Sequence, residues 1–319
     1  MAHYLITGGA GFIGSNLTHA LLNRGDEVRV LDNFSTGRHA NVADIVNEVE
    51  IIEGDLRDAG SCKQAVAGVD YVLHLASIPS VEHSVLHPDL CMEVNVNATI
   101  NLLLAARDAN VKRLVFASSS AIYGDSPVLP KSEEMKPLPP SPYAVGKLAA
   151  EHSCQIFYKL YGLETVCLRY FNVFGPRQDP TSQYSAVIPL FARAMLSGKA
   201  PIIFGDGLQS RDFTYVNDII QANLLAVSAP DVAGQVFNIA CGQSQTLLDL
   251  VAALNAVLNT SIEPVHAPPR QGEVKHSVAD ISRAEKLLGY KVGTTFAEGL
   301  AKTAEWYSQF IEKPLLSAS

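Results

Sequence analysis

The chain has 319 residues, of which 48% are hydrophobic and 18% charged, and it carries a formal net charge of -8 at pH 7. This length is enough for one large domain or two smaller ones with a substantial core. The negative charge argues against a nucleic-acid-binding protein, because neutralising phosphates requires clustered Lys and Arg.

In chain order, the first half alternates short β-branched runs with longer amphipathic segments. The predicted strands are His3–Ile6, Glu27–Asp32, Glu50–Glu53, Tyr71–Leu75, Arg113–Ala117 and Thr165–Arg169. Helical spacing occurs at 12–24, 89–109 and 142–161. Runs such as VLHLA are almost wholly apolar, which is typical of strands buried on both faces. The alternation predicts an α/β fold, a doubly wound parallel (Rossmann) sheet covered by helices on both faces.

After about residue 170 the pattern loosens and prolines punctuate it. The later elements expected are a buried strand at 235–240 and helices at 244–258, 281–288 and 295–312. We therefore predict two parts. The main domain is 1–170, with 215–240 returning to it, and a smaller C-terminal α/β substrate-binding region comprises 171–214 and 241–319.

Four glycines occur within seven residues in LITGGAGFIGS, directly after the first predicted strand. Gly8, Gly11 and Gly14 have the spacing GxxGxxG between a strand and a helix. The first permits a tight turn, and the second lets backbone N–H groups approach a pyrophosphate at the helix N-terminus. The third allows close packing of helix on strand. The context therefore predicts a dinucleotide-binding turn rather than a plain glycine-rich loop.

The acid that ends the second predicted strand, Asp32, indicates which dinucleotide binds. Its carboxylate is suited to accept hydrogen bonds from ribose hydroxyls and would repel a 2′-phosphate. We predict NAD rather than NADP, with Arg38 as the residue that keeps NADP open. The pair Asp55–Leu56, after the third strand, lies either beside the adenine or in a surface turn. Small residues at 75–77 suit cofactor approach after the fourth strand.

The sequence YAVGK places Tyr143 and Lys147 four residues apart, on one face of a helix. A free tyrosine has a pKa near ~10, so a base active at neutral pH requires a shift of about three units, or roughly 4 kcal/mol. An ammonium 4–6 Å away supplies energy of about that order. Three serines at 118–120 follow the fifth strand, where a parallel sheet opens its ligand crevice. Together these residues predict acid–base chemistry on a hydroxyl of the substrate.

In combination, the glycine turn, the strand-end acid, the serine cluster and YxxxK resemble the extended short-chain dehydrogenase/reductase family over nearly the whole chain. Within that family the chain is most similar to nucleotide-sugar 4-epimerases, especially those acting on UDP-N-acetylhexosamines. The matching stretches are TGGAGFIGS, LDNFSTG, EGDLRD, HLAS, ASSSAIYGD, SPYAVGK, LRYFNVFGPRQDP, YSAVIP, FGDGLQSRDFTYVND and RQGEVKHSVAD. The resemblance implies an isomerase that inverts C4 of a UDP-sugar through a transient 4-keto intermediate, with NAD as cofactor.

The resemblance also implies roles for residues at matching positions. Tyr143 would be the base, Lys147 would set its pKa, and Ser120 would be the hydroxyl partner. The implied NAD-binding set is Gly8, Gly11, Phe12, Ile13, Gly14, Asp32, Asn33, Ser35, Thr36, Gly37, Asp55, Leu56, Leu75, Ala76, Ser77, Asn95, Ser118, Tyr143, Lys147 and Tyr170. The implied substrate-binding set is Ser120, Tyr143, Asn172, Val187, Ile202, Phe204, Arg211, Arg270, Glu273 and Ser277, in which the two arginines would grip the diphosphate. No metal site is expected.

Two departures from related enzymes bear on the reaction and the substrate. Ala121 and Ile122 stand where related dehydratases and decarboxylases carry acids, which favours simple epimerisation. Ser277 stands where glucose-type epimerases often carry a bulky tyrosine, and a serine leaves room for a 2-acetamido group. We therefore expect UDP-N-acetylglucosamine and UDP-N-acetylgalactosamine as the substrates. A UDP-glucose/UDP-galactose or UDP-glucuronate 4-epimerase, or a catalytically silent NAD-binding sensor, stays open.

The remaining expectations concern assembly and location. Five scattered cysteines without a Cys-x-x-Cys pair fit reduced thiols in the cytoplasm. No apolar run reaches the roughly 20 residues that span a bilayer, so no membrane partner is expected. Leu102, Leu103, Ala149 and Phe157 are expected to be exposed on helices 89–109 and 142–161. In similar proteins such helices pair into a four-helix bundle, so a homodimer through them is predicted, with a monomer as the alternative.

Overall fold

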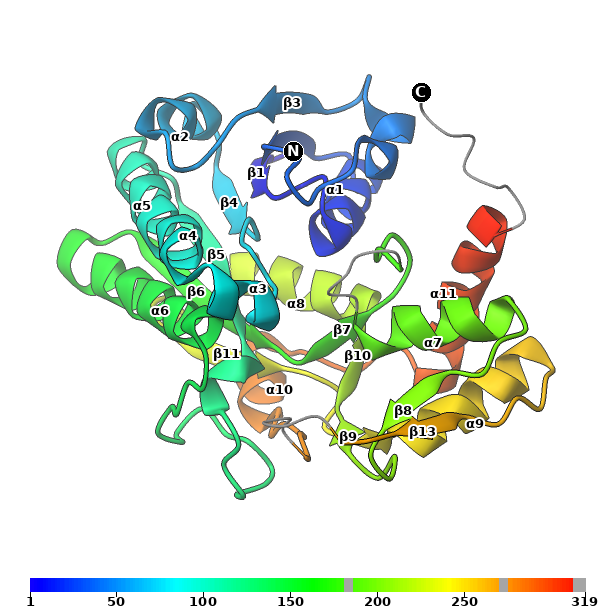
Figure 1. Cartoon of the computed structure of the whole chain (residues 1–319). Coiled ribbons are helices and arrows are strands. Elements are labelled where there is room, and N and C mark those ends of the chain that lie inside the picture. The colour runs from blue at the N-terminus through cyan, green and yellow to red at the C-terminus, as the bar shows by residue number, and fades with distance from the viewer. Residues whose placement is uncertain (181–185, 270–274, 312–319) are drawn as a thin grey trace.

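The computed structural model describes residues 1–180, 186–269 and 275–311 (Figure 1). Its centre is a seven-stranded sheet in which every pairing is parallel, in the order β11-β6-β5-β4-β1-β2-β3. These strands are β1 (His3–Thr7), β2 (Glu27–Asp32), β3 (Glu50–Glu53), β4 (Tyr71–His74), β5 (Arg113–Ser119), β6 (Glu164–Tyr170) and β11 (Val236–Ile239). The predicted doubly wound α/β fold is confirmed, and each expected strand ends within two residues of its predicted bounds.

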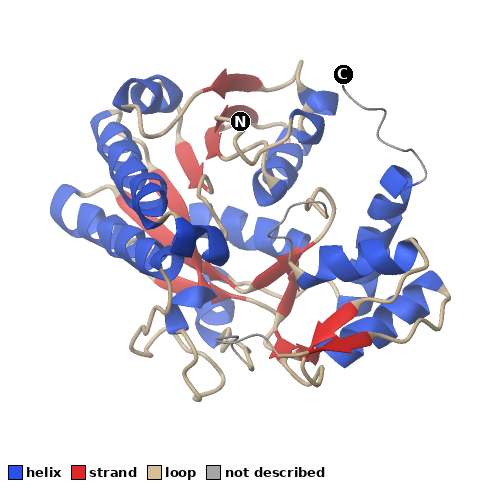
Figure 2. Cartoon of the chain, viewed as in Figure 1, coloured by secondary structure: helices blue, strands red, loops and turns tan. Residues whose placement is uncertain are grey.

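Helices cover both faces of this sheet, as Figure 2 shows. The α-helices in the described part of the chain are α1 (Phe12–Asn23), α2 (Ala59–Val66), α3 (Val81–Leu86), α4 (Pro88–Met92), α5 (Ala98–Asp108), α6 (Pro142–Tyr161), α7 (Val187–Leu196), α8 (Val216–Ser228), α9 (Leu247–Leu258), α10 (Ser282–Leu288) and α11 (Phe296–Ile311). One buried core joins the sheet to α1, α8 and α10, and a second joins it to α2, α5 and α6. Strands packed on both sides explain the almost continuous apolar runs.

Segments after residue 170 build a separate apolar cluster around α7, α9 and α11, which lie together in Figure 1. Its short strands pair two by two: β7 (Asn172–Phe174) with β10 (Phe213–Tyr215), β8 (Ile202–Phe204) with β13 (Val265–Ala267), and β9 (Ser210–Arg211) with β12 (Gln245–Thr246). Helix α10 lies in the stretch expected to belong to the substrate-binding region, but its Ala284 and Leu288 pack in the core of the main sheet. The short 3-10 turns are η1 (His39–Asn41), η2 (Ala43–Ile45) and η4 (Ser120–Tyr123).

Two predicted helices have different limits in the structure. The helix expected at 244–258 begins at Leu247, because Thr246 and Asp249 form a capping box that defines its N-terminus. The helix expected at 89–109 is interrupted by a single π-helical turn, η3 (Glu93–Asn97), between α4 and α5. Such turns frequently occur at functional sites. Among the described residues, no helix has the length and apolar character needed to cross a membrane.

The apolar positions expected on the surface of two helices need correction. Leu102, Leu103 and Phe157 are buried in the core between the sheet and helices α2, α5 and α6. The prediction for them was wrong, because helical spacing alone does not say which face meets the sheet. The large apolar side chains exposed on α5 and α6 are Leu104, Val145, Ile156, Tyr158, Leu160 and Tyr161.

The strand order places a ligand crevice at the carboxyl ends of β1 and β4. β1 pairs with β2 on one side and β4 on the other, so the chain reverses its direction of winding at this point. In open parallel sheets, ligands bind where the connections diverge at such a switch point. The segments that leave β1 and β4 are the glycine turn and residues 75–77. Both predicted cofactor segments therefore flank one crevice.

Candidate active site

The glycine turn between β1 and α1 has no room for side chains. Gly8 has a φ of +71°, and a Cβ there would lie 2.8 Å from the backbone N of Ala76. A Cβ on Gly14 would lie 2.1 Å from the backbone oxygen of Gly8. Because real Cβ atoms do not approach so closely, the turn requires glycine at both positions. Helix α1 is thereby packed closely against the end of β1.

The N-terminus of α1 fits the diphosphate of a dinucleotide. Its N-cap is Gly11, and no side chain caps the helix there. The first-turn N–H groups, which include those of Phe12 and Ile13, therefore face the crevice without a protein side chain competing for them. Uncapped N–H groups and the helix dipole together favour an anionic group. The open backbone N–H groups of α1 therefore support the predicted binding of NAD.

Asp32 lies at the end of β2, beside the same turn. Its carboxylate accepts hydrogen bonds from the N–H groups of Ala10 and Phe34, both at 2.9 Å. Burial raises the pKa of Asp32 above its ordinary value, and these two hydrogen bonds oppose the rise. Gly37 packs over the carboxylate, since a Cβ there would lie 2.8 Å from both carboxylate oxygens. The acid is thus held rigidly where the ribose of an NAD would lie.

The other predicted residues of the adenosine side form an exposed network. Asn33 accepts hydrogen bonds from the N–H and hydroxyl of Ser35 and donates to Asp55 at 2.8 Å, while Thr36 is exposed. Arg57 pairs with Asp55 at 2.8 Å and, by hydrogen bonding, lowers the pKa of Asp55 to about 2. These polar side chains rim the crevice next to β2 and β3. Beside them, Leu56 is buried.

The exit from β4 is tied to β1 and to the π-helical turn. Leu75 donates its N–H to the backbone oxygen of Thr7 at 3.1 Å, and Ala76 donates its N–H to the Thr7 hydroxyl at 3.3 Å. Ser77 is half-buried after them. Asn95, on η3, binds both backbone groups of Ile78, accepting from its N–H at 2.8 Å and donating to its oxygen at 3.2 Å. In this structure Asn95 therefore holds the crevice wall.

The predicted base lies in the first turn of α6. Tyr143 is half-buried there, and the hydroxyl that acts on the pKa of its phenol, lowering it by hydrogen bonding, is that of Ser119 rather than the expected Ser120. Ser119 is the last residue of β5 and accepts the N–H of Ala121 at 3.1 Å, which leaves its proton for Tyr143. Ser120 begins the following turn, η4. Three consecutive serines do not indicate where the strand ends. The sequence therefore could not distinguish Ser119 from Ser120 as the residue near the phenol.

Burial dominates the electrostatics of the Tyr143–Lys147 pair in the protein without cofactor. Burial raises the pKa of Tyr143, and the Ser119 hydrogen bond only opposes that rise. Burial lowers the pKa of Lys147 to about 8. The ammonium donates to the backbone oxygen of Ala117 at 2.9 Å and lies over the Phe116 ring, with 5.1 Å to the centroid. In the protein without cofactor, the net effect of these surroundings is therefore to raise the pKa of the phenol.

Ser118 belongs to a buried hydrogen-bond network next to the site in this structure. Its buried hydroxyl donates to Glu151 at 2.7 Å. Glu151 also pairs with Arg169 at 2.6 Å, and both side chains are almost wholly buried. Arg169 in turn donates to the hydroxyl of Tyr123 at 2.8 Å. This network ties β5, α6, β6 and η4 together, and the sequence analysis missed it because a buried ion pair across elements leaves no local pattern.

The neighbouring Tyr170 and Asn172 point in different directions. Tyr170 is buried in the main core, where its hydroxyl bonds Asn223 at 3.0 Å. Its side chain therefore does not line the crevice, and only its backbone is near the strand end. Asn172 is exposed at the start of β7 and pairs in register with Phe213.

The predicted substrate residues on the C-terminal side are partly brought together. The N–H of Ser277 donates to the backbone oxygen of Ser210 at 3.1 Å, which places Ser277 beside Arg211. Arg211 donates to the backbone oxygens of Ser210 and Lys275. Phe204 is linked to this strand through Gln209, whose amide donates to its backbone oxygen at 2.7 Å. The remaining predictions are Val187 and Ile202, the first residues of α7 and β8, and Arg270 and Glu273, which lie outside the described residues.

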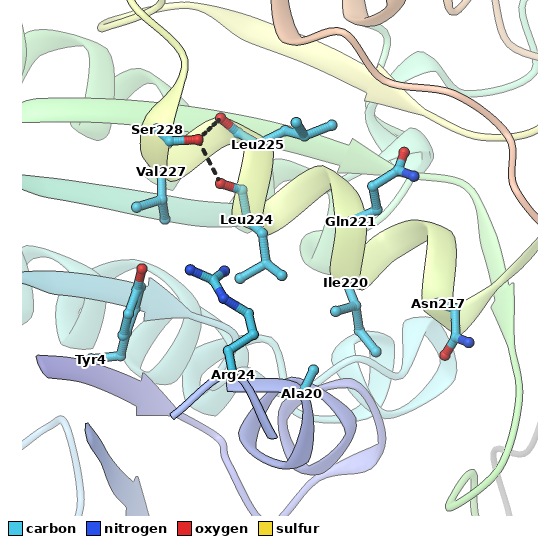
Figure 3. A pocket seen from close by; sticks show the side chains of 10 residues that line it. All are labelled: Tyr4, Ala20, Arg24, Asn217, Ile220, Gln221, Leu224, Leu225, Val227 and Ser228. Carbon is cyan, nitrogen blue, oxygen red and sulfur yellow. Dashed lines mark hydrogen bonds between the residues drawn. The ribbon is translucent and has the colours of Figure 1, made fainter. Parts of the chain in front are cut away.

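A groove elsewhere on the molecule is separate from this site. It has a volume of about 530 Å³ and lies between β1, the end of α1, and α8 (Figure 3). Tyr4, near the start of β1, and Arg24, just after α1, line it. Both residues lie at the end of their elements opposite the glycine turn. The groove therefore lies near the amino-terminal end of β1, whereas the crevice lies at its carboxyl end.

The fold and the site together define a dinucleotide-dependent enzyme with a Tyr/Lys pair at the crevice. Residues 4–240 match the NAD dependent epimerase/dehydratase family. The UDP-glucose 4-epimerase of Mycolicibacterium smegmatis is 38% identical over 307 residues, covering 95% of this chain and 97% of that protein.

Two solved structures have the same architecture. The UDP-N-acetylglucosamine 4-epimerase of Methanobrevibacter ruminantium, in complex with UDP-N-acetylmuramic acid, is 41% identical with a TM-score of 0.93, over 97% of this chain and 99% of that one. The Thermus thermophilus UDP-glucose 4-epimerase in complex with NAD is 37% identical with a TM-score of 0.87, over 96% and 98% of the two chains. The chain belongs to the NAD-dependent epimerase/dehydratase family. It is an isomerase, and its cofactor is NAD.

Proposed function

We propose that this enzyme inverts C4 of a UDP-sugar, and that its substrates are UDP-N-acetylglucosamine and UDP-N-acetylgalactosamine. The observation that carries the reaction is the placement of Tyr143 in the first turn of α6 and of Ser119 at the end of β5, the strand that pairs with β4 at the crevice. A phenol and a hydroxyl at such a point are suited to exchange a proton with one sugar hydroxyl.

Each residue near the crevice has a definite task in this proposal. Tyr143 takes the proton of the 4-hydroxyl and later returns it, and Ser119 holds the oxygen between them. NAD, when bound there, would supply the acceptor and donor of the C4 hydride and, in its oxidised form, a positive charge near the phenol. Lys147 adds a second charge, which together with the first would lower the pKa of Tyr143. The 4-keto sugar rotates about its phosphate linkage before reduction, while Arg211 holds the diphosphate.

The first experiment removes the phenolic oxygen alone. In Tyr143→Phe, we expect kcat to fall by at least ~10²-fold, since acid–base catalysis of this kind contributes about 10²–10⁴-fold. NAD retention and UDP affinity should change little, because the ring remains. Measurement of epimer formation by NMR, with bound NAD quantified after denaturation, checks both. Turnover close to that of the wild type would rule out the mechanism.

The choice of substrate rests on Ser277. This small, half-buried residue lies beside Arg211, so a sugar whose diphosphate binds Arg211 has space for its 2-substituent near Ser277. The similarity to the Methanobrevibacter ruminantium enzyme supports the same choice. The alternatives are UDP-glucose/UDP-galactose and UDP-glucuronate, and a silent NAD-binding sensor would show no epimer formation with any of them.

A substrate panel with one matched variant decides among these alternatives. For the wild type we expect kcat/KM to be about tenfold or more higher on UDP-N-acetylglucosamine than on UDP-glucose or UDP-glucuronate. In Ser277→Tyr this preference should shrink or reverse, because the phenol would fill the space of the acetamido group. Equal kcat/KM on all three sugars in the wild type would contradict the acetamido proposal without touching the 4-epimerase mechanism.

We also propose the assembly and location expected for such an enzyme. Helices α5 and α6 lie side by side and expose Leu104, Val145, Ile156 and Leu160, which support a homodimer through the segments 89–109 and 142–161 (Figure 1). Sedimentation at micromolar concentration should give twice the chain mass. Five free thiols support the cytoplasm as its location. The division into 1–170 with 215–240, and 171–214 with 241–319, is kept as a proposal, with α10 joining the main core.

A further inference from the structure

The first turn of α6 has all of its N–H groups satisfied, and one of them is satisfied from outside the helix. Pro142 has no N–H, and the N–H of Ala144 donates to the Ser141 hydroxyl at 3.2 Å. The N–H of Val145 donates to the backbone oxygen of Ser141 at 2.9 Å. The N–H of Tyr143 donates to the hydroxyl of Ser84 on α3, at 3.1 Å. The proposed base is therefore held by a residue 59 positions earlier in the chain.

The Ser84 hydroxyl has a single orientation in the structure. Its side chain is 0% exposed, and it donates its proton to the backbone oxygen of Val81 at 2.6 Å. A hydroxyl whose proton is used in this way presents its lone pairs to another donor, which here is Tyr143. Helix α3 packs against α6 at this point. Its own first turn is capped by Ser80, which accepts the N–H of His83 at 3.0 Å.

The segment that carries Ser84 also forms the wall of the crevice. It leaves β4 at residue 75, and both backbone groups of Ile78 are held by Asn95. Ser84 follows six residues later, two residues before α3 ends at Leu86. The chain from 75 to 86 thus has two anchors, one on η3 and one on the base itself. The position of the Tyr143 backbone is tied to the wall against which the cofactor binds.

We propose that Ser84 is a positioning residue for Tyr143, which rests on the proposed role of Tyr143 as the base. By holding the N–H of Tyr143, Ser84 fixes the first turn of α6 so that the phenol meets the Ser119 hydroxyl. The hydrogen bonds of the Ser84 hydroxyl are to the backbone groups of Val81 and Tyr143, so Ser84 acts on the phenol through the backbone. Its loss would leave the base in place but would weaken the hydrogen bond that opposes protonation of the phenol.

The experiment compares two serines that each cap the same helix turn. Ser84→Ala removes the bond to the N–H of Tyr143, and Ser141→Ala removes the bond to the N–H of the next residue, Ala144. Both should lower Tm by a few degrees. The deciding measurement is the ultraviolet titration of the Tyr143 phenol in NAD-loaded protein, taken as the difference from a matched Tyr143→Phe background. It does not depend on turnover.

We expect the titration midpoint of Tyr143 to rise by about half a unit or more in Ser84→Ala and to stay unchanged in Ser141→Ala. The matching kinetic result is a kcat lower by about threefold or more in Ser84→Ala, with KM for the UDP-sugar within about twofold. Ser84→Cys, which keeps the shape but accepts hydrogen bonds weakly, should be intermediate and carries the test if Ser84→Ala fails to fold. A midpoint unmoved in the folded Ser84 variants, or moved equally in Ser141→Ala, would overturn the proposal. Retained activity in Tyr143→Phe would instead overturn the proposed function.

Discussion

The N-termini of α1 and α6 face the same crevice and are built in opposite ways. Helix α1 begins at Gly11 with no side-chain cap, so its first N–H groups are left for a ligand. Helix α6 begins with Ser141 and Pro142, and the N–H groups of its first turn are satisfied within the protein. In the function proposed above, the first terminus binds an anion and the second supports a reacting side chain.

This difference shows how one fold separates binding from chemistry. A helix N-terminus that binds a phosphate needs N–H groups without a side-chain cap. Glycine leaves them free, but it loses more backbone conformational entropy on folding than other residues do. A helix N-terminus that holds a catalytic base is better ordered when its N–H groups have acceptors within the protein, because each satisfied N–H restricts the position of the first turn. The three predictions that follow test this contrast and the burial of Lys147 in α6, from the largest expected effect to the smallest.

The largest effect is expected from Gly14→Ala in α1. The added Cβ would lie 2.1 Å from the Gly8 oxygen, so the turn has to open and the N–H groups lose their direction. NAD affinity, measured by fluorescence titration, should fall by about 100-fold or more, equivalent to roughly 3 kcal/mol.

The matched control for this change lies in α6. In Gly146→Ala the Cβ would meet its nearest atom, the Asn95 Cβ, at an ordinary 3.5 Å. The free energy of unfolding should therefore rise by up to about 1 kcal/mol through helix propensity, with NAD affinity unchanged. If the two alanines weakened NAD binding equally, the contrast between the termini would be wrong.

A pH-dependent effect of intermediate size is expected from Lys147. Burial holds its pKa at about 8, below the ordinary value of 10.5, so the folded protein loses this proton before the unfolded chain does. The unfolded chain therefore binds more protons between pH 8 and 10.5, and stability from this group rises with pH in that window. The stability difference between wild type and Lys147→Met, both without cofactor, should move in favour of the wild type by roughly 1 kcal/mol per pH unit. Denaturant titrations at several pH values measure it, and a flat difference would contradict the assigned shift.

The smallest effect is expected from Ser141→Ala, which removes the N-cap of α6. Loss of such a cap costs about 1 kcal/mol, so the midpoint of urea unfolding should fall without a change in slope. Because Ser84 still holds the N–H of Tyr143, kcat should stay within about twofold of the wild type. A kcat loss far larger than this would mean that Ser141, too, positions the base.

Much of the fold could be predicted because its signals are local. The strand-end positions of Asp32 and the glycine turn follow from periodicity and backbone sterics, and both lie where the sequence placed them. Predictions that needed knowledge of a contact were less accurate. Ser120 was chosen over Ser119, and Leu102 and Phe157 were placed on the surface. In each case the missing information was the exact end of a strand or the direction of a helix face.

The amino-acid sequence by itself determined the parallel sheet, the open dinucleotide turn and the spacing of Tyr143 and Lys147, because each depends on residues that are neighbours in the chain. Only the tertiary structure decided which serine meets the phenol, that Glu151 pairs with Arg169, and that Ser84 holds the backbone of the base. Those contacts join segments far apart in sequence. Their geometry is determined by how the helices pack on the sheet, which no local pattern of residues records.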